Sequence, residues 1–218
     1  MNAPILEFQD VWKTFGNDKT KLDALKEIDL EIEENSVNLI LGPSGSGKST
    51  LLNLISLMDT PTKGKIFIKG KNTLNMSKSE RSKFRRDEIG IIYQRDNLFP
   101  YLNILENVMV PMIVKDKEKA IKLLKIAGLT KITEFPDEIH IVEQQQTALV
   151  RAAINNPSIL IADEPTGELN LEAADKLMNL IKSVGNKSTV LIASNNQDLD
   201  KYCDNIFYIK EGMILENK

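Results

Sequence analysis

The chain has 218 residues and a formal net charge of −3, from 28 Lys and Arg against 31 Asp and Glu. This even balance gives no general electrostatic reason to expect a nucleic acid as the partner. A hydrophobic content of 42% excludes a wholly disordered chain, and the length suits one large domain or one domain with a small lobe.

The sequence also indicates a compartment. Cys203 is the single cysteine, so no internal disulfide is possible and a reducing compartment fits best. No apolar run approaches the roughly 20 residues that a membrane-spanning helix needs. The N-terminal stretch lacks the basic and apolar regions of a signal peptide. We therefore expect a cytoplasmic protein, and docking onto a membrane protein remains open.

The first third combines strand patterns with a glycine-rich loop. Residues 6–8 and 30–32 alternate apolar and polar positions on either side of a turn at residues 16–18, which predicts strands. Residues 37–41 form a short apolar run typical of a buried parallel strand. This run leads into a glycine-rich loop and a helix that begins near Lys48. Residues 65–68 predict a further strand.

The middle of the chain changes character. Residues 77–86 are basic with a helical pattern, and residues 89–93 form an apolar strand pattern. Helix signals follow at residues 104–110 and 117–126, the second closed by Gly128. We interpret residues 95–139 as a helical lobe inserted into a core made of residues 1–94 and 140–218.

The last third returns to strand-then-helix order. Apolar runs at residues 159–162 and 190–193 are each followed by a polar loop and a helical pattern, and repeated βα units predict a mostly parallel sheet. Residues 206–209 and 213–215 predict a terminal hairpin. The predicted fold class is α/β: a mostly parallel sheet core, an antiparallel β part and the helical lobe.

One motif predicts a phosphate site. Residues 42–49 read Gly-Pro-Ser-Gly-Ser-Gly-Lys-Ser and match the whole G-x-x-x-x-G-K-[ST] pattern between a strand and a helix. The glycines let backbone N–H groups form an anion-binding nest, and the helix adds its positive N-terminal end. Lys48 supplies a mobile charge for the outer phosphates, and the Ser49 hydroxyl can ligate Mg²⁺.

A second apolar run ends in two carboxylates, Asp163 and Glu164. Asp163, at the end of the strand, can hold Mg²⁺ through water, and Glu164 can orient or deprotonate the attacking water. A buried strand that ends in adjacent carboxylates is poor for folding alone. We therefore interpret the pair as functional rather than as a solvated acidic loop.

Beyond these motifs, essentially the whole chain resembles the ATP-binding subunits of ABC transporters. Tyr-Gln at 93–94 and Asn-Leu-Phe-Pro at 97–100 are similar to the family's Q-loop, and residues 163–167 match its acidic motif and the start of its D-loop. Phe15 occupies the position where the family has an aromatic ring against adenine. Residues 86–90, with the Pro-Thr-Gly after the acidic pair, resemble the lipoprotein-release and macrolide-export branch.

The resemblance implies ATP and Mg²⁺ as ligands, with a role for each matching residue. Glu164, Lys48 and Gln94 would be catalytic, and Ser49, Gln94 and Asp163 would serve the metal. The implied ATP-binding residues are Phe15, Gly42, Ser44, Gly45, Ser46, Gly47, Lys48, Ser49 and Thr50. The resemblance also implies a membrane-spanning transporter subunit bound through the helical lobe, a homodimer or heterodimer with a second ATP-binding subunit, and a peripheral place on the inner face of the cell membrane.

The chain departs from the family at the signature motif, LSGGQ. An ungapped alignment places Ile139, His140, Ile141, Val142 and Glu143 there, and none of the five is identical. In the family this loop binds the γ-phosphate of the other subunit's ATP, which needs a hydroxyl donor and close backbone approach. Ile141 and Val142 are bulky and block that approach, and Glu143 adds a carboxylate that repels phosphate. We expect His140 to be an ordinary surface or interface side chain.

Two further positions differ. The family carries a switch histidine after the strand at 190–193, where this chain has Asn195. Its amide can hydrogen-bond a phosphate oxygen, but it carries no positive charge and relays no proton. Asn170 stands where the family's D-loop ends in Asp.

These losses affect both nucleotide sites of a dimer. A homodimer would lack the signature and the histidine at both sites, and an intact partner could not fully repair either. We therefore expect an ATP-binding subunit of a membrane transporter, of export or lipoprotein type, that binds Mg-ATP and hydrolyses it slowly. The alternatives are an ordinary fast transport ATPase that tolerates the substitutions and a soluble nucleotide-dependent regulator or scaffold without transport. A kinase would leave Gln94 and the helical lobe unexplained.

Overall fold

The computed structural model describes residues 4–17, 19–94 and 97–215, which divide into two compact units. The first unit comprises the residues up to Arg85 and those from Thr189 onward, and the second comprises Arg86–Ser188. Asp18, in the predicted first turn, and Arg95, the first residue of the predicted lobe, lie outside the described residues.

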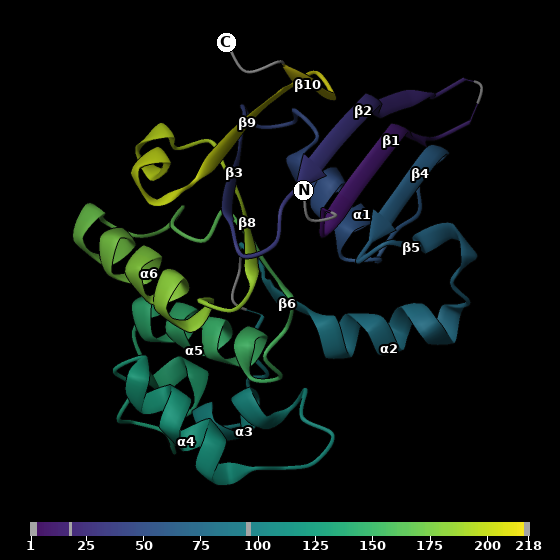
Figure 1. Ribbon diagram of the computed structural model, residues 1–218. Helices are drawn as coiled ribbons and strands as arrows, with labels where there is room; N and C mark the ends of the chain where they lie inside the picture. Colours follow the sequence, from purple (N-terminus) through teal and green to yellow (C-terminus); the bar gives the residue numbers. More distant parts are fainter. Residues whose placement is uncertain (1–3, 18, 95–96, 216–218) are drawn as a thin grey trace. The chain divides into compact units, whose positions relative to one another are not determined.

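The first unit carries an antiparallel sheet (Figure 1). Its strands lie in the spatial order β2 (Leu22–Ile32), β1 (Leu6–Phe15), β4 (Lys63–Ile68) and β5 (Lys71–Asn72). The predicted alternation along β1 is confirmed, since Leu6 and Phe8 are buried. β4 begins before the predicted position because its first residue, Lys63, already pairs with Trp12 of β1.

The parallel strands of the first unit carry the glycine-rich loop. β3 (Val37–Leu41) pairs in parallel with β8 (Thr189–Ser194) and β9 (Asn205–Lys210), and β9 forms the predicted hairpin with β10 (Met213–Leu215). Every residue of β8 is buried, as expected inside a parallel sheet. Helix α1 (Lys48–Ile55) follows the loop after β3 and contacts β8 and β2.

Two short 3₁₀ turns complete the first unit. They are η1 (Thr73–Asn75) and η3 (Gln197–Tyr202). Helix α2 (Lys78–Glu88) follows η1 and crosses the boundary between the two units, and none of its residues is buried.

The second unit pairs a short parallel sheet with helices. β6 (Ile89–Ile92) runs parallel to β7 (Ile159–Asp163). The other elements are α3 (Ile104–Met109), α4 (Lys117–Ile126), η2 (Pro136–Glu138), α5 (Ile141–Ala153) and α6 (Leu171–Val184).

Helices α3, α4 and α5 lie together in the second unit (Figure 1) and share an apolar cluster. Its buried members are Ile104, Leu105, Val108, Met112, Ala120, Leu124, Ala127, Leu129, Ile139, Val150 and Ile154. The α/β class with parallel and antiparallel parts is thus confirmed. The extent of residues 95–139 as a separate lobe stays a prediction. Within the three described ranges, we find no helix with the length and apolar character to cross a membrane.

A buried asparagine shapes the loop between β6 and α3. Asn107 is 0% exposed, and its Oδ1 accepts a hydrogen bond from the Phe99 amide at 2.7 Å. Its Nδ2 reaches the carbonyl oxygens of Phe99, Leu102 and Asn103 at 3.1, 2.8 and 3.1 Å. These contacts fix the turn that presents Phe99 and Tyr101 at the surface, where the two side chains are 48% and 90% exposed.

We predict that Asn107→Ala lowers the free energy of unfolding by about 2–3 kcal/mol, because several buried backbone groups lose their partner. Asn103→Ala is the matched control, because it removes only the side-chain bond to Glu106 N that caps α3, and it should cost about 1 kcal/mol. Urea unfolding followed by circular dichroism measures both. Equal losses in the two variants would contradict the assigned role of Asn107.

Candidate functional site

The phosphate loop lies between β3 and α1, as the sequence predicts. Gly47 is the N-cap of α1 and has a φ of 109°, in the region that favours glycine. A Cβ at this position would lie 2.7 Å from the carbonyl oxygen of Ala24. A Cβ on Gly42 would lie 2.2 Å from the carbonyl oxygen of Ile209. Both glycines are therefore required by close backbone approach, and no side chain caps α1.

Two polar groups of the loop point to an anionic ligand. Lys48 is 6% exposed, and its Nζ donates to the carbonyl oxygens of Gly42 at 2.8 Å and Pro43 at 3.1 Å. The ammonium therefore lies over the loop itself. Ser46 Oγ is buried and has no hydrogen-bond partner in the described part of the chain. A buried hydroxyl without a partner is costly, and a phosphate oxygen at this loop would satisfy it.

The remaining predicted ATP-binding residues lie on the same unit. Phe15 ends β1 and is 43% exposed. Ser44, Gly45 and Ser49 are exposed along the loop, and Thr50 is half-buried on α1. The first unit thus contains every residue that the resemblance assigns to direct ATP binding, and it also contains Asn195.

The acidic pair lies at the end of β7 in the second unit, where Asp163 is the last residue of the strand and Glu164 follows it. The four residues before Asp163 are all buried, and Asp163 itself is half-buried. Glu164 has a φ of 47°, which is uncommon for a residue with a side chain and is concentrated at functional sites. The turn continues with a hydrogen bond from Gly167 N to the Glu164 carbonyl oxygen at 3.1 Å. The left-handed residue redirects the chain directly after the strand.

Asn170 has a local structural role. It is the N-cap of α6, and its Oδ1 accepts a hydrogen bond from Ala173 N at 2.9 Å. Asn and Asp are about equally good at this position of a helix. Asn170 therefore caps α6 as the family's Asp would, and the two residues differ in charge.

Gln94 is exposed and lies shortly after the end of β6. Two side chains of α5 reach backbone carbonyl oxygens at or near Gln94. Gln145 Nε2 lies 3.5 Å from the Gln94 carbonyl oxygen, and Arg151 Nη1 donates to the Asn97 carbonyl oxygen at 2.8 Å. Gln145 is 2% exposed. Sequence reasoning did not assign a role to Gln145 or Arg151. The available signal was a polar residue on the buried face of an otherwise amphipathic helix.

The segment aligned with the signature motif is the start of a helix. α5 begins at Ile141, so three of the five aligned residues are already helical. Glu143 Oε2 accepts a hydrogen bond from His140 N at 3.0 Å, which closes the N-terminus of α5 with the chain's own carboxylate. Ile139 is buried in the cluster with α3 and α4, whereas His140 is exposed and Ile141 is 40% exposed.

Asn195 follows β8 in an exposed bend. The neighbouring residues complete the turn: Ser194 Oγ accepts from Asn196 N at 3.1 Å, and Asn196 Oδ1 accepts from Asp198 N at 2.9 Å. Asn196 is therefore the residue that caps η3, and this leaves the Asn195 side chain outside the cap.

A buried strand, a glycine-rich turn at a helix N-terminus and a lysine folded over that turn define a nucleotide-binding fold of the P-loop class. The ABC transporter family model matches residues 25–167. This segment includes the phosphate loop, both carboxylates and the degenerate signature.

Known proteins agree with that match along the whole chain. The lipoprotein-releasing system ATP-binding protein LolD of Wigglesworthia glossinidia brevipalpis is 40% identical, over 98% of this chain and 97% of that protein. The macrolide export ATP-binding/permease protein MacB of a Shewanella species is 33% identical over 100% of this chain, which covers 35% of that longer protein. The chain belongs to the ABC transporter family, and the resemblance to the lipoprotein-release and macrolide-export branch is confirmed.

A solved structure has the same fold. The ATP-binding cassette MJ0796 of Methanocaldococcus jannaschii, a dimer in a post-hydrolysis state bound to ADP and Pi, is 34% identical and superposes with a TM-score of 0.89. The match covers 98% of this chain and 97% of that one. The predicted P-loop fold of ABC type is therefore confirmed.

Proposed function

We propose that the chain is an ATP-binding subunit of an ABC-type membrane transporter that binds Mg-ATP and hydrolyses it slowly. One contrast supports this proposal. The first turn of α1 carries no acidic residue and the loop before it keeps a buried, unpartnered hydroxyl at Ser46, whereas the first turn of α5 carries Glu143, whose carboxylate accepts a hydrogen bond from His140 N. The first helix start suits a phosphate, and the second repels one.

The residues of the first unit bind the nucleotide in this proposal. The backbone of residues 42–47 and the Lys48 ammonium hold the phosphates, and the Phe15 ring stacks on the adenine. Ser49 provides a hydroxyl ligand for Mg²⁺, a cation that prefers oxygen ligands. When bound, Mg²⁺ neutralises charge on the outer phosphates.

The residues of the second unit serve the reaction. Asp163 and Gln94 contribute oxygen atoms toward the metal, and Glu164 accepts a proton from the attacking water or orients it. The left-handed backbone at Glu164 turns the chain at the end of the buried strand, which is consistent with this role.

Slow turnover follows from the residues at the signature and switch positions. Catalysis of phosphoryl transfer is mainly positioning and charge stabilisation, and one missing contact costs about 2–4 kcal/mol in the transition state. Glu143 is used to cap its own helix. Asn195 can donate a hydrogen bond but adds no positive charge. Binding of ATP to the single subunit needs neither residue, so the affinity of the isolated subunit and its turnover are separable.

The transporter partner should contact the second unit. The Asn107-anchored turn exposes Phe99 and Tyr101, and Ile113 and Val114 are 68% and 81% exposed. The last two residues also line a pocket of about 410 Å³. Phe99 and Tyr101 are exposed apolar side chains on one turn, which is typical of an interaction site. We propose that this surface docks a membrane-spanning subunit and places the chain on the inner face of the cell membrane.

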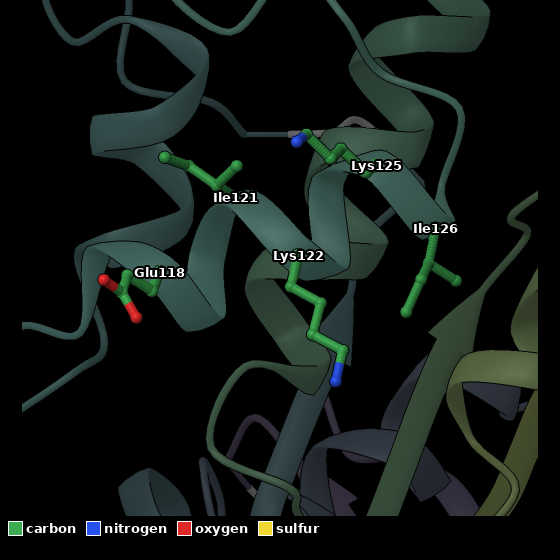
Figure 2. A pocket seen from close by; sticks show the side chains of 5 residues that line it. All are labelled: Glu118, Ile121, Lys122, Lys125 and Ile126. Atoms are coloured by element: carbon green, nitrogen blue, oxygen red, sulfur yellow. The ribbon is translucent and has the colours of Figure 1, made fainter.

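A second apolar surface on the same unit serves as a control. Ile121 and Ile126 on α4 line a pocket of about 480 Å³ together with Glu118, Lys122 and Lys125 (Figure 2). Ile126 is 54% exposed, close to the 48% of Phe99. The two surfaces can therefore be compared by the same substitution.

We predict that Phe99→Asp releases the chain from membranes that contain its partner, because a charge in an apolar contact must be desolvated. ATP affinity should be unchanged. Ile126→Asp should leave membrane association intact. The measurement is co-sedimentation with membranes from cells that express the native complex. Retention of Phe99→Asp on membranes, or release of Ile126→Asp, would reject the turn at Phe99 as the dock.

We predict that Lys48→Ala weakens binding of a non-hydrolysable ATP analogue at least tenfold, a difference of about 1.4 kcal/mol, because a charge-assisted contact to phosphate is lost. Calorimetric titration in the presence of Mg²⁺ measures it. Lys176→Ala is the control, since this exposed lysine pairs only with Glu172 on α6 among the contacts that we describe. Equal affinity of Lys48→Ala and the parent would count against nucleotide binding at the loop.

We predict that turnover of the isolated chain is reduced roughly 10²-fold or more relative to an intact ATPase. Restoring Leu-Ser-Gly-Gly-Gln at residues 139–143 together with Asn195→His should raise hydrolysis and promote ATP-dependent dimers. Asn195→His alone should restore little, because a homodimer would still lack the signature. Glu164→Gln in the repaired chain should abolish the gain.

Steady-state phosphate release at saturating Mg-ATP measures this prediction. Turnover of the unaltered chain near 1 s⁻¹ or above, about the ordinary enzyme range, would instead establish an ordinary fast transport ATPase.

A further inference from the structure

Lys13 is a buried cation beside the exposed ring of Phe15. It is 9% exposed, and its Nζ lies 4.9 Å from the centroid of the Phe15 ring. This distance is within the roughly 6 Å over which a cation and an aromatic face attract each other. The two residues are two positions apart on β1, a spacing at which side chains leave the same face of a strand. The ring is still 43% exposed, so it keeps surface for a stacking partner.

Two further contacts fix the ammonium group. Lys13 Nζ is 2.6 Å from Asp59 Oδ1 and donates to the Thr60 carbonyl oxygen at 3.0 Å. Asp59 Oδ1 also accepts from Thr60 N at 2.7 Å, which holds the carboxylate in place. The lysine is therefore both ion-paired and hydrogen-bonded, and its position is defined more closely than that of a surface lysine.

The anchor of Lys13 is linked to the phosphate loop. Asp59 and Thr60 follow directly on the turn after α1, and the Asp59 amide donates to the Asn53 carbonyl oxygen within that helix at 3.2 Å. The N-terminus of the same helix begins at the phosphate loop. Lys13 thus connects the Phe15 ring to the C-terminal end of the helix whose start would hold the phosphates.

We propose that Lys13 is a positioning residue for the base of the bound nucleotide. Its ammonium holds the Phe15 ring in one orientation and covers part of it, so that the remaining exposed face stacks on the aromatic base. This inference depends on the proposed ATP binding. It assigns a role to Lys13, which contributes to nucleotide binding only through the Phe15 ring and only at the base.

The chain offers a matched control in Lys63. Its Nζ lies 5.6 Å from the Trp12 ring and 2.7 Å from Asp10 Oδ2, so it makes the same kinds of contact as Lys13. The side chain is 64% exposed, however, and its ring is not the one expected to stack. The hydrogen bonds from Lys63 and then from Trp12 lower the pKa of Asp10.

The test compares a non-hydrolysable ATP analogue with tripolyphosphate, which lacks the base, by calorimetric titration. Lys13→Met keeps the aliphatic stem and removes the charge, and we expect the affinity for the analogue to fall roughly three- to tenfold. Affinity for tripolyphosphate should not change, and Lys13→Arg should retain most of the parent's affinity for the analogue. Lys63→Met should bind both ligands like the parent.

A double-mutant cycle with Phe15→Ala tests the route of the effect. In the Phe15→Ala background, Lys13→Met should cause no further loss of affinity for the analogue. An equal loss in both backgrounds, or a parallel loss of tripolyphosphate binding, would overturn the inference. Thermal unfolding checks that each variant is folded. Should Lys13→Met unfold, Asp59→Ala provides a second comparison, because it removes the carboxylate that holds the ammonium and keeps the lysine.

The failures of the two proposals are distinguishable. If the parent binds the analogue and Lys13→Met binds it equally well, the positioning role is wrong and the nucleotide site stands. If the parent itself binds no analogue, the proposed function and this inference both fall.

Discussion

The charge beside the start of a helix decides whether that start can hold an anion, and α1 and α5 differ in this charge. α1 starts at Gly47 without a side-chain cap, so its first N–H groups remain available to a ligand. α5 starts beside Glu143, whose carboxylate accepts a hydrogen bond from His140 N. One carboxylate therefore separates a helix start that attracts an anion from a helix start that already carries a negative charge.

This difference has a steric counterpart. The loop before α1 uses glycines where a Cβ would collide with the backbone at Ala24 and Ile209. The segment before α5 has Ile139 in the core and Ile141 at the surface. Ile139 packs in the apolar cluster shared with α3 and α4, so the start of α5 remains packed. The fold can therefore lose the signature chemistry without losing α5.

Much of the fold could be predicted because short local sequence patterns identify several of its strands and helices. The apolar runs gave β3, β7 and β8, and the glycine-rich motif located the start of α1 at Lys48. The alignment of residues 139–143 with a family loop did not indicate that α5 begins at Ile141, where Glu143 Oε2 accepts a hydrogen bond from His140 N.

The roles of Lys13, Asn107 and Gln145 could not be predicted from the sequence. Each is a buried polar residue whose partners lie elsewhere in the chain, so no local pattern distinguishes it from a surface residue. Asn170 illustrates the reverse case, because a position that looked like a loss against the family's Asp caps α6. Alignment to a motif shows which functional residues are present or replaced. Only the three-dimensional structure shows that a replacement such as Asn170 retains a structural role.

The separation of binding from turnover has a thermodynamic consequence under the proposed function. A ligand that binds only the folded state stabilises it by mass action, by about 2.7 kcal/mol at a hundredfold excess over its Kd. Transition-state contacts contribute nothing to that stabilisation, because they form only during the reaction. A single subunit that keeps Lys48 therefore retains this stabilisation by ATP even without the signature residues. Its ATP would leave by dissociation instead of being hydrolysed. The fraction of subunits that hold ATP would therefore depend on the ATP concentration more than on the rate of hydrolysis.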